Sequence, residues 1–159
     1  MATHRLVAED GRGLGAFNWF AVHATSMNNT NLLVNGDNKG YASYLFERKV
    51  NGPTAGGVRP GQGPFVAAFA STNLGDVSPN TEGPRCRDTG LACDTLHSTC
   101  NGKSQQCSSS GPGDDMFDSC EIIGRKQFDK AVELLAAAEK AQVHLCCAAA
   151  ATAATPRRA

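Results

Sequence analysis

Two short segments near the start of the chain alternate hydrophobic and polar residues, which indicates extended structure. Residues 5–8 and residues 14–24 carry this pattern on either side of Glu9-Asp10-Gly11-Arg12-Gly13. An Asp-Gly pair between two extended segments is typical of a β-hairpin. Both faces of the second segment carry apolar side chains, so we expect a strand that is buried on both sides.

A helix is predicted over residues 37–50, with Asp37 as a suitable N-cap, and a further strand over residues 65–70. The helix has residues that share one face at helical spacing, and we expect this face to be buried. They are Tyr41, Tyr44, Leu45 and, through its aliphatic stem, Lys49. Because strand, helix and strand in this order form a parallel βαβ unit, we expect an α/β fold.

A longer helix is predicted from Asp114 onward, where Pro112 and Asp114 are start signals. Apolar or small residues recur along it at helical spacing and define a core face. They are Phe117, Cys120, Gly124, Phe128, Ala131, Leu135 and Ala138. After residue 143 the sequence becomes alanine-rich, LCCAAAATAATPRRA. We therefore assign residues 1–143 to the fold and residues 144–159 to a tail outside it.

Composition argues against two classes of function. The chain of 159 residues carries 15 basic and 15 acidic residues, without a basic patch interleaved with aromatic residues, so we expect no nucleic-acid partner. No apolar run approaches the roughly 18–20 residues that a membrane span needs. The first residues lack the apolar core of a signal peptide.

Four cysteines recur at intervals of seven in a stretch, residues 81–113, that is rich in small polar residues. They are Cys86, Cys93, Cys100 and Cys107. Such a set can form two disulfides or a metal site, and the absence of paired CxxC motifs favours disulfides. Four cysteines allow three connectivities, and the spacing does not choose among them. Disulfides would imply an oxidising compartment.

Two residues near predicted strand ends are candidates for chemistry. Ser78 lies in a polar loop, STNLGDVSPN, which follows the strand over residues 65–70. It is a turn serine or a nucleophile, and a serine hydroxyl needs a base or a metal ion to become reactive. No GxSxG elbow surrounds it, which argues against an ordinary serine hydrolase. His23 is a core histidine that donates to a carbonyl, or a metal ligand.

Three motifs together resemble one family. Residues 17–27 read FNWFAVHATSM, residues 36–44 read GDNKGYASY and residues 73–80 read NLGDVSPN. Their wording, order and spacing resemble the neutral ceramidases, amidases that cleave N-acylsphingosine. The resemblance runs from about residue 5 to about residue 143, a middle slice of a family member's catalytic domain. We therefore expect the chain to be a segment of a larger secreted or membrane-associated enzyme.

The resemblance implies zinc-dependent hydrolysis of ceramide to sphingosine and fatty acid. It implies that His23 is one zinc ligand and that Ser78 is the nucleophile, although attack by zinc-bound water stays an alternative. The family's other ligands are a histidine from an upstream His-x-His segment and a distant glutamate and tyrosine. The chain contains no His-x-His segment. We expect no tight zinc binding and no turnover by the chain alone.

The resemblance further implies the cysteine pairing, Cys86 with Cys100 and Cys93 with Cys107. It also implies a ceramide substrate and therefore contact with a membrane surface; the oligomeric state is left open. His97 lies in the cysteine-rich stretch, where we expect it to be solvated. The alternative function is non-catalytic, a disulfide-linked fragment that binds a partner.

Overall fold

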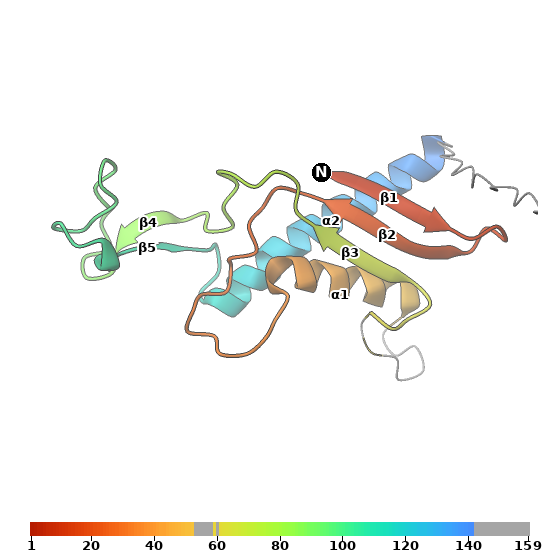
Figure 1. The fold of residues 1–159 in the computed structure, drawn as a ribbon, viewed down its shortest axis with the longest axis horizontal. Coiled ribbons are helices and arrows are strands. Elements are labelled where there is room, and N and C mark those ends of the chain that lie inside the picture. Colours follow the sequence, from red (N-terminus) through yellow and green to blue (C-terminus); the bar gives the residue numbers. More distant parts are fainter. Residues whose placement is uncertain (53–58, 60, 142–159) are drawn as a thin grey trace, which may run out of the picture.

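Figure 1 shows the fold of the chain, a computed structural model that describes residues 1–52, 59 and 61–141. A three-stranded sheet packs against two helices, and a second, two-stranded sheet lies apart from them. The elements in chain order are β1 (Ala2–Val7), β2 (Gly13–Trp19), α1 (Asp37–Asn51), β3 (Val66–Ala70), β4 (Gly83–Cys86), the 3-10 turn η1 (Ser104–Gln106), β5 (Cys107–Ser110) and α2 (Met116–Ala141). The predicted tail, residues 144–159, lies outside the described residues.

The predicted hairpin is confirmed, because β1 and β2 pair in antiparallel fashion. The prediction that the second strand is buried on both sides is wrong. Ala16 is buried in the core, whereas Phe17 on the opposite face is 43% exposed. The cause is that Phe46 of α1 and Ala131 of α2 both pack against the Ala16 face. The described helices therefore cover one face of the sheet.

The predicted βαβ unit and the α/β class are also confirmed. β2 and β3 pair in parallel, from Gly15 opposite Val66 to Trp19 opposite Ala70, and α1 connects them. β2 ends at Trp19 rather than at residue 24, because His23 bonds through its N–H to Val77, in the loop after β3, and not to the strand β3 itself. The parallel arrangement places the carboxyl ends of both strands at the same edge, so the segments that follow them are neighbours.

Helix α1 has the predicted extent but not the predicted cap or core face. Gly36 occupies the N-cap position, and Asp37 is the first helical residue, with a φ of 52°. Ala42 and Phe46 are the buried apolar residues. The predicted face of Tyr41, Tyr44, Leu45 and Lys49 is half-buried or exposed. The helix faces the sheet and α2 through Ala42 and Phe46 because the aromatic core forms there, where the Phe46 ring stacks on Phe65 at 5.8 Å.

Helix α2 buries its predicted core face only in the middle of the helix. Gly124 and Ala131 are buried, but Phe117 is 57% exposed and Ala138 is exposed as well. The helix has 26 residues and its partner α1 has 15, so its ends extend beyond the neighbouring helix. None of the helices in the described part of the chain is long and apolar enough to cross a membrane.

The cysteine-rich stretch forms a hairpin of β4 and β5 that projects away from the rest of the molecule (Figure 1). Two disulfides cross it, Cys86 with Cys100 and Cys93 with Cys107, which is the pairing that the resemblance implies. Their Cα atoms lie 5.6 Å and 5.9 Å apart, within the ordinary range for disulfides.

Candidate functional site

The candidate site lies where the two parallel strands end. We call residues 20–27, which follow β2, the β2 loop, and residues 71–80, which follow β3, the β3 loop. His23 lies in the first and Ser78 in the second. Loops at the carboxyl ends of parallel strands are the usual place for ligands in α/β proteins.

His23 joins the two loops through its backbone and its ring. Its N–H donates to the carbonyl of Val77 at 3.1 Å, and its Nε2 lies 2.8 Å from the carbonyl oxygen of Gly75. Because a carbonyl only accepts hydrogen bonds, we assign the ring proton to Nε2, which leaves a lone pair on Nδ1. His23 therefore bonds to a carbonyl, as one of the two sequence interpretations expected, and keeps one nitrogen that can bind a metal ion.

Ser78 is an exposed residue on a tightly turned segment of the β3 loop. Its N–H donates to the carbonyl of Asp76 at 3.0 Å, and its Oγ accepts the N–H of Asn80 at 3.1 Å. Pro79, the next residue, is fully buried. The loop is thus anchored directly beside Ser78, which is itself an exposed residue. These contacts are those of a turn serine, and they leave its oxygen accessible to a substrate.

The backbone brings His23 and Ser78 into one neighbourhood, because Val77 directly precedes Ser78. Among the described residues, the His23 ring bonds to the carbonyl of Gly75 and not to the Ser78 hydroxyl. The two side chains therefore do not form a hydrogen-bonded nucleophile and base here. Their separate contacts lie at the same edge of the sheet.

A buried polar network lies beneath these loops, and our sequence reasoning missed it. It consists of Asn38, Lys39 and Gln127, with exposures of 0%, 8% and 4%. Asn38 donates through Nδ2 to the carbonyl of His23 at 3.0 Å and accepts at Oδ1 from Gln127 Nε2 at 2.9 Å. Because the helix of a βαβ unit begins at the carboxyl edge of the sheet, the polar first turn of α1 could have indicated this network.

Lys39 is the charged member of this network. Its ammonium donates to the carbonyls of Phe20 at 2.9 Å and Ala70 at 3.2 Å, and to Gln127 Oε1 at 3.3 Å. Desolvation lowers the pKa of this ammonium below its ordinary value of 10.5. Lys39 thus connects the end of β2, the end of β3 and helix α2.

Asp37 anchors the β2 loop instead of capping the helix with its side chain. Its carboxylate accepts the N–H groups of Ser26 at 3.0 Å and Met27 at 2.9 Å, and also that of Asn38. In the first turn of α1, Asp37 therefore holds the β2 loop, and Lys39 holds the ends of β2 and β3.

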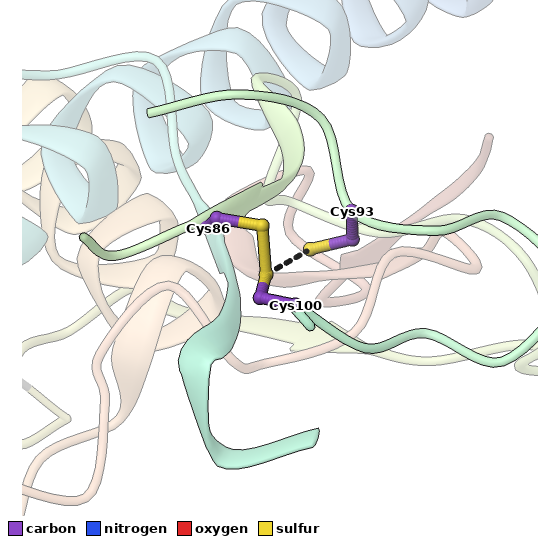
Figure 2. A group of neighbouring side chains, drawn as sticks. All are labelled: Cys86, Cys93 and Cys100. Atoms are coloured by element: carbon purple, nitrogen blue, oxygen red, sulfur yellow. Dashed lines mark hydrogen bonds between the residues drawn. A yellow bond between two sulfur atoms is a disulfide. The ribbon is translucent and has the colours of Figure 1, made fainter. Parts of the chain in front are cut away.

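The described residues do not complete the zinc site that the resemblance implies. A catalytic zinc takes about three protein ligands and one open position, and His23 supplies one imidazole. Within the described part of the chain, the group of three or more metal-ligating atoms is made of Cys86, Cys93 and Cys100. Figure 2 shows why these sulfurs are close: Cys86 is bonded to Cys100, and Cys93 Sγ lies 3.7 Å from Cys100 Sγ. All three sulfurs belong to disulfides and offer no thiolate.

The other histidine considered for chemistry is exposed. His97 pairs through Nδ1 with Asp94 Oδ2 at 2.8 Å on the projecting hairpin. Its side chain is 67% exposed, as expected for a solvated histidine.

The fold and these loops together define an α/β protein with candidate chemistry at the carboxyl ends of two parallel strands. Its structure is similar to "Ceramidase complexed with C2", with a TM-score of 0.58 and 36% identity over 86% of this chain and 16% of that chain. It is also similar to the neutral ceramidase of Pseudomonas aeruginosa, with a TM-score of 0.54 and 36% identity over 86% of this chain and 17% of that chain.

The sequence comparisons agree with these structures. The chain is 57% identical over 136 residues to neutral ceramidase B of Dictyostelium discoideum, and 53% identical over 131 residues to the neutral ceramidase of Drosophila melanogaster. These matches cover 84% and 82% of this chain and 18% of each relative. The N-terminal sequence model of the neutral/alkaline non-lysosomal ceramidases matches residues 1–150.

The chain therefore belongs to the neutral/alkaline non-lysosomal ceramidase family. It spans less than a fifth of the length of these curated relatives. The family match includes residues 144–150, which our sequence analysis assigned to a tail. Because these residues lie outside the described part of the structure, the boundary at residue 143 stays a prediction.

Proposed function

We propose that this chain takes part in hydrolysing the N-acyl amide bond of ceramide, yielding sphingosine and a free fatty acid. The observation that carries the proposal is the hydrogen bond from the His23 N–H to the Val77 carbonyl, 3.1 Å long. It holds the candidate zinc ligand beside the loop with the candidate nucleophile. Membership of the ceramidase family supports the choice of substrate.

In this proposal Ser78 supplies the oxygen that attacks the amide carbonyl carbon. The acyl group would pass to Oγ, the C–N bond would break, and the sphingosine amine would leave with the proton that the Ser78 hydroxyl gives up. Water would then cleave the acyl ester and release the fatty acid. Direct attack by water, oriented by the Ser78 hydroxyl, is the alternative order of events. In either case the buried Pro79 and the Asn80 N–H fix the place of Ser78 Oγ.

The proposed cofactor is zinc, to which His23 would contribute one ligand through Nδ1. A bound zinc ion would polarise the amide carbonyl or lower the pKa of a water molecule. Since the described residues supply one ligand, we derive no step that passes through the metal. We expect the isolated chain to bind zinc weakly and to hydrolyse no ceramide.

The proposed location follows from the disulfides and the substrate. Two disulfides persist in an oxidising compartment, which favours the secretory pathway or the extracellular side of a membrane. Ceramide resides in membranes, so the active protein would have to contact a lipid surface. Oligomeric state is not part of the proposal.

A chimera provides the test, because the chain alone is expected to be inactive. The segment of Dictyostelium discoideum neutral ceramidase B that matches this chain would be replaced by the corresponding residues of this chain. Ceramide hydrolysis would then be measured for the chimera, for Ser78→Ala and for Ser71→Ala. Ser71 is an exposed serine of the same β3 loop and provides the matched control.

We expect kcat to fall at least about a hundredfold for Ser78→Ala and to stay unchanged for Ser71→Ala. His23→Ala should lower the zinc content of the purified chimera. An active chimera whose kcat is unaffected by Ser78→Ala would contradict the role of Ser78. Chelator-sensitive turnover by the isolated chain would show that its own residues complete the site. If Ser78→Ala and His23→Ala both leave the chimera unchanged, the non-catalytic alternative gains support.

A further inference from the structure

The buried ammonium of Lys39 bonds to both strand ends, which filling the core alone would not require. Its three N–H groups have three acceptors, the carbonyls of Phe20 and Ala70 and the Oε1 of Gln127. Phe20 directly follows β2, and Ala70 is the last residue of β3. An apolar side chain of similar length would fill this space without the cost of desolvating a charge, but it could not bond to the carbonyls.

The acceptors of Lys39 are neutral groups. Within the described residues, no carboxylate forms an ion pair with it. The ammonium therefore acts as a three-way donor between fixed backbone positions. This arrangement sets the spacing between the two strand ends from which the β2 loop and the β3 loop begin.

Gln127 transmits this arrangement to His23. Its Oε1 accepts from Lys39 while its Nε2 donates to Asn38 Oδ1, so both ends of the amide are engaged and its orientation is fixed. Asn38 in turn donates to the backbone carbonyl of His23. A continuous chain of hydrogen bonds thus runs from the strand ends through helix α2 to the residue that carries the imidazole.

We propose that Lys39, acting through Gln127 and Asn38, is a positioning residue that fixes the His23 imidazole against the β3 loop. Only the identity of His23 and Ser78 as the reacting groups rests on the proposed function; the positioning itself does not. Lys39 touches neither group directly. Its effect is to hold His23 Nε2 against Gly75, which keeps the Nδ1 lone pair available for a metal ion.

The test uses the full chain and two readouts by NMR, the tautomer of the His23 ring and amide hydrogen exchange. The variants are Lys39→Met and, as a matched control, Lys49→Met on the exposed side of the same helix. In the unsubstituted chain and in Lys49→Met, we expect a single Nε2–H tautomer. In Lys39→Met we expect mixed tautomers, and exchange at the His23 amide at least about tenfold faster relative to the core amide of Ala131.

A second variant keeps the test decisive if Lys39→Met fails to fold. Gln127→Glu keeps an acceptor for Lys39 but loses the N–H that bonds to Asn38. We expect it to mix the His23 tautomers while leaving exchange at the core amide of Phe46 unchanged. An unchanged His23 tautomer in the folded variants would overturn the proposal, as would loss of protection that is equal at His23 and at the core amides.

These readouts involve neither ceramide nor zinc, so they separate this inference from the proposed function. If Ser78→Ala leaves an active chimera unaffected while Lys39→Met still releases the His23 ring, the proposed function fails and the positioning role stands. If Ser78 is essential and the His23 ring is unaffected in Lys39→Met, the positioning role fails and the function stands.

Discussion

The imidazole Nε2 of His23 lies 2.8 Å from the carbonyl oxygen of Gly75, fifty-two positions further along the chain. The contact follows from the parallel pairing of β2 and β3, which puts the segments after both strands at one edge of the sheet. Ser78 lies three residues beyond Gly75 in the same loop. The two residues that the resemblance connects with catalysis therefore lie on neighbouring loops at one edge of the sheet.

The crossing of α1 and α2 depends on Gly124. A Cβ at this position would lie 2.7 Å from the carbonyl oxygen of Asn38 and 2.9 Å from Cδ1 of Tyr41. Since the backbone of Asn38 cannot move without shifting α1, we expect Gly124→Ala to lower the free energy of unfolding by about 1–3 kcal/mol. Urea unfolding followed by circular dichroism provides the measurement.

Gly40 of α1 offers the matched control, because a Cβ there would meet nothing within 4 Å. Gly40→Ala should raise the free energy of unfolding by roughly 0.5–1 kcal/mol, since alanine loses less backbone entropy in a helix. Equal effects of the two substitutions would show that contact between the helices at Gly124 does not limit their approach.

The disulfides should stabilise the projecting hairpin rather than the body of the fold. β4 and β5 pair with each other, and among the described residues the core cluster of the sheet and helices shares no member with the cysteine cluster. Replacing Cys86 and Cys100 together by serine removes a cross-link between residues 14 apart. For a loop of this length we expect the free energy of unfolding of the hairpin to fall by about 3 kcal/mol.

Hydrogen exchange measured by mass spectrometry would locate this loss. We expect peptides from residues 83–110 to lose protection while peptides from α1 and α2 keep theirs. Cys120→Ser, which removes a thiol outside the disulfides, is the control and should leave the hairpin unchanged. Loss of protection throughout the chain would mean that the hairpin and the body unfold as one unit.

The thiol of Cys120 should be unreactive in the folded chain. Burial has the largest effect on its pKa, and the nearby negative charges of Asp37 and Glu121 add to it. Together they raise the pKa of Cys120 to about 11. At pH 8 roughly a thousandth of this thiol is then ionised, and the thiolate is the reactive form. We expect alkylation by iodoacetamide at least about tenfold slower in the folded chain than in urea, measured by peptide mass at Cys120. Equal rates in both states would show that the thiol is accessible and normally acidic.

Acid should weaken the contact between His97 and Asp94 on the hairpin. The hydrogen bond from His97 and those from backbone N–H groups hold the pKa of Asp94 below 3.8. Because the folded state favours the carboxylate, its stabilising effect is present above about pH 3.8 and is lost as the pH falls through the lower folded-state pKa.

An NMR titration of the Asp94 carboxyl carbon tests the cause. In His97→Ala the pKa of Asp94 should rise toward 3.8, since the hydrogen bond from the His97 side chain, which lowers it most, is gone. A pKa of Asp94 that stays where it was would assign the shift to the backbone N–H groups of Leu96 and His97 alone.

Local patterns were sufficient to predict most elements of the fold. The Asp-Gly turn and the alternating residues beside it predicted the β1–β2 hairpin, and the apolar run before the polar loop predicted β3. These signals operate over a few residues, so they do not depend on the rest of the molecule. The predicted faces of the helices were less accurate, because the buried side of a helix is set by its neighbours. Phe117 has helical spacing but is 57% exposed, beside a pocket that it lines together with Asp37 and Tyr41 of α1.

The candidate site was predicted in part. The motifs identified His23 and Ser78, but they did not show how His23 contacts the β3 loop. Asp37 looked like a helix cap from its position in the sequence. Its carboxylate instead holds the backbone of Ser26 and Met27, which precede it by ten or more residues. A side chain that bonds to a distant segment leaves no pattern among the residues next to it in the sequence.

The sequence by itself determined the β1–β2 hairpin, α1, β3 and α2 and the family, because short-range periodicity and long motifs are read directly from the order of residues; it did not show the strands β4 and β5. Only the tertiary structure decided that Lys39 is a buried donor to both strand ends and that Gln127, 88 positions away, completes its hydrogen bonds. The physical reason is that partners for a buried ammonium are selected by the packing of α1, α2 and the sheet. Sequence neighbours contribute little to that selection.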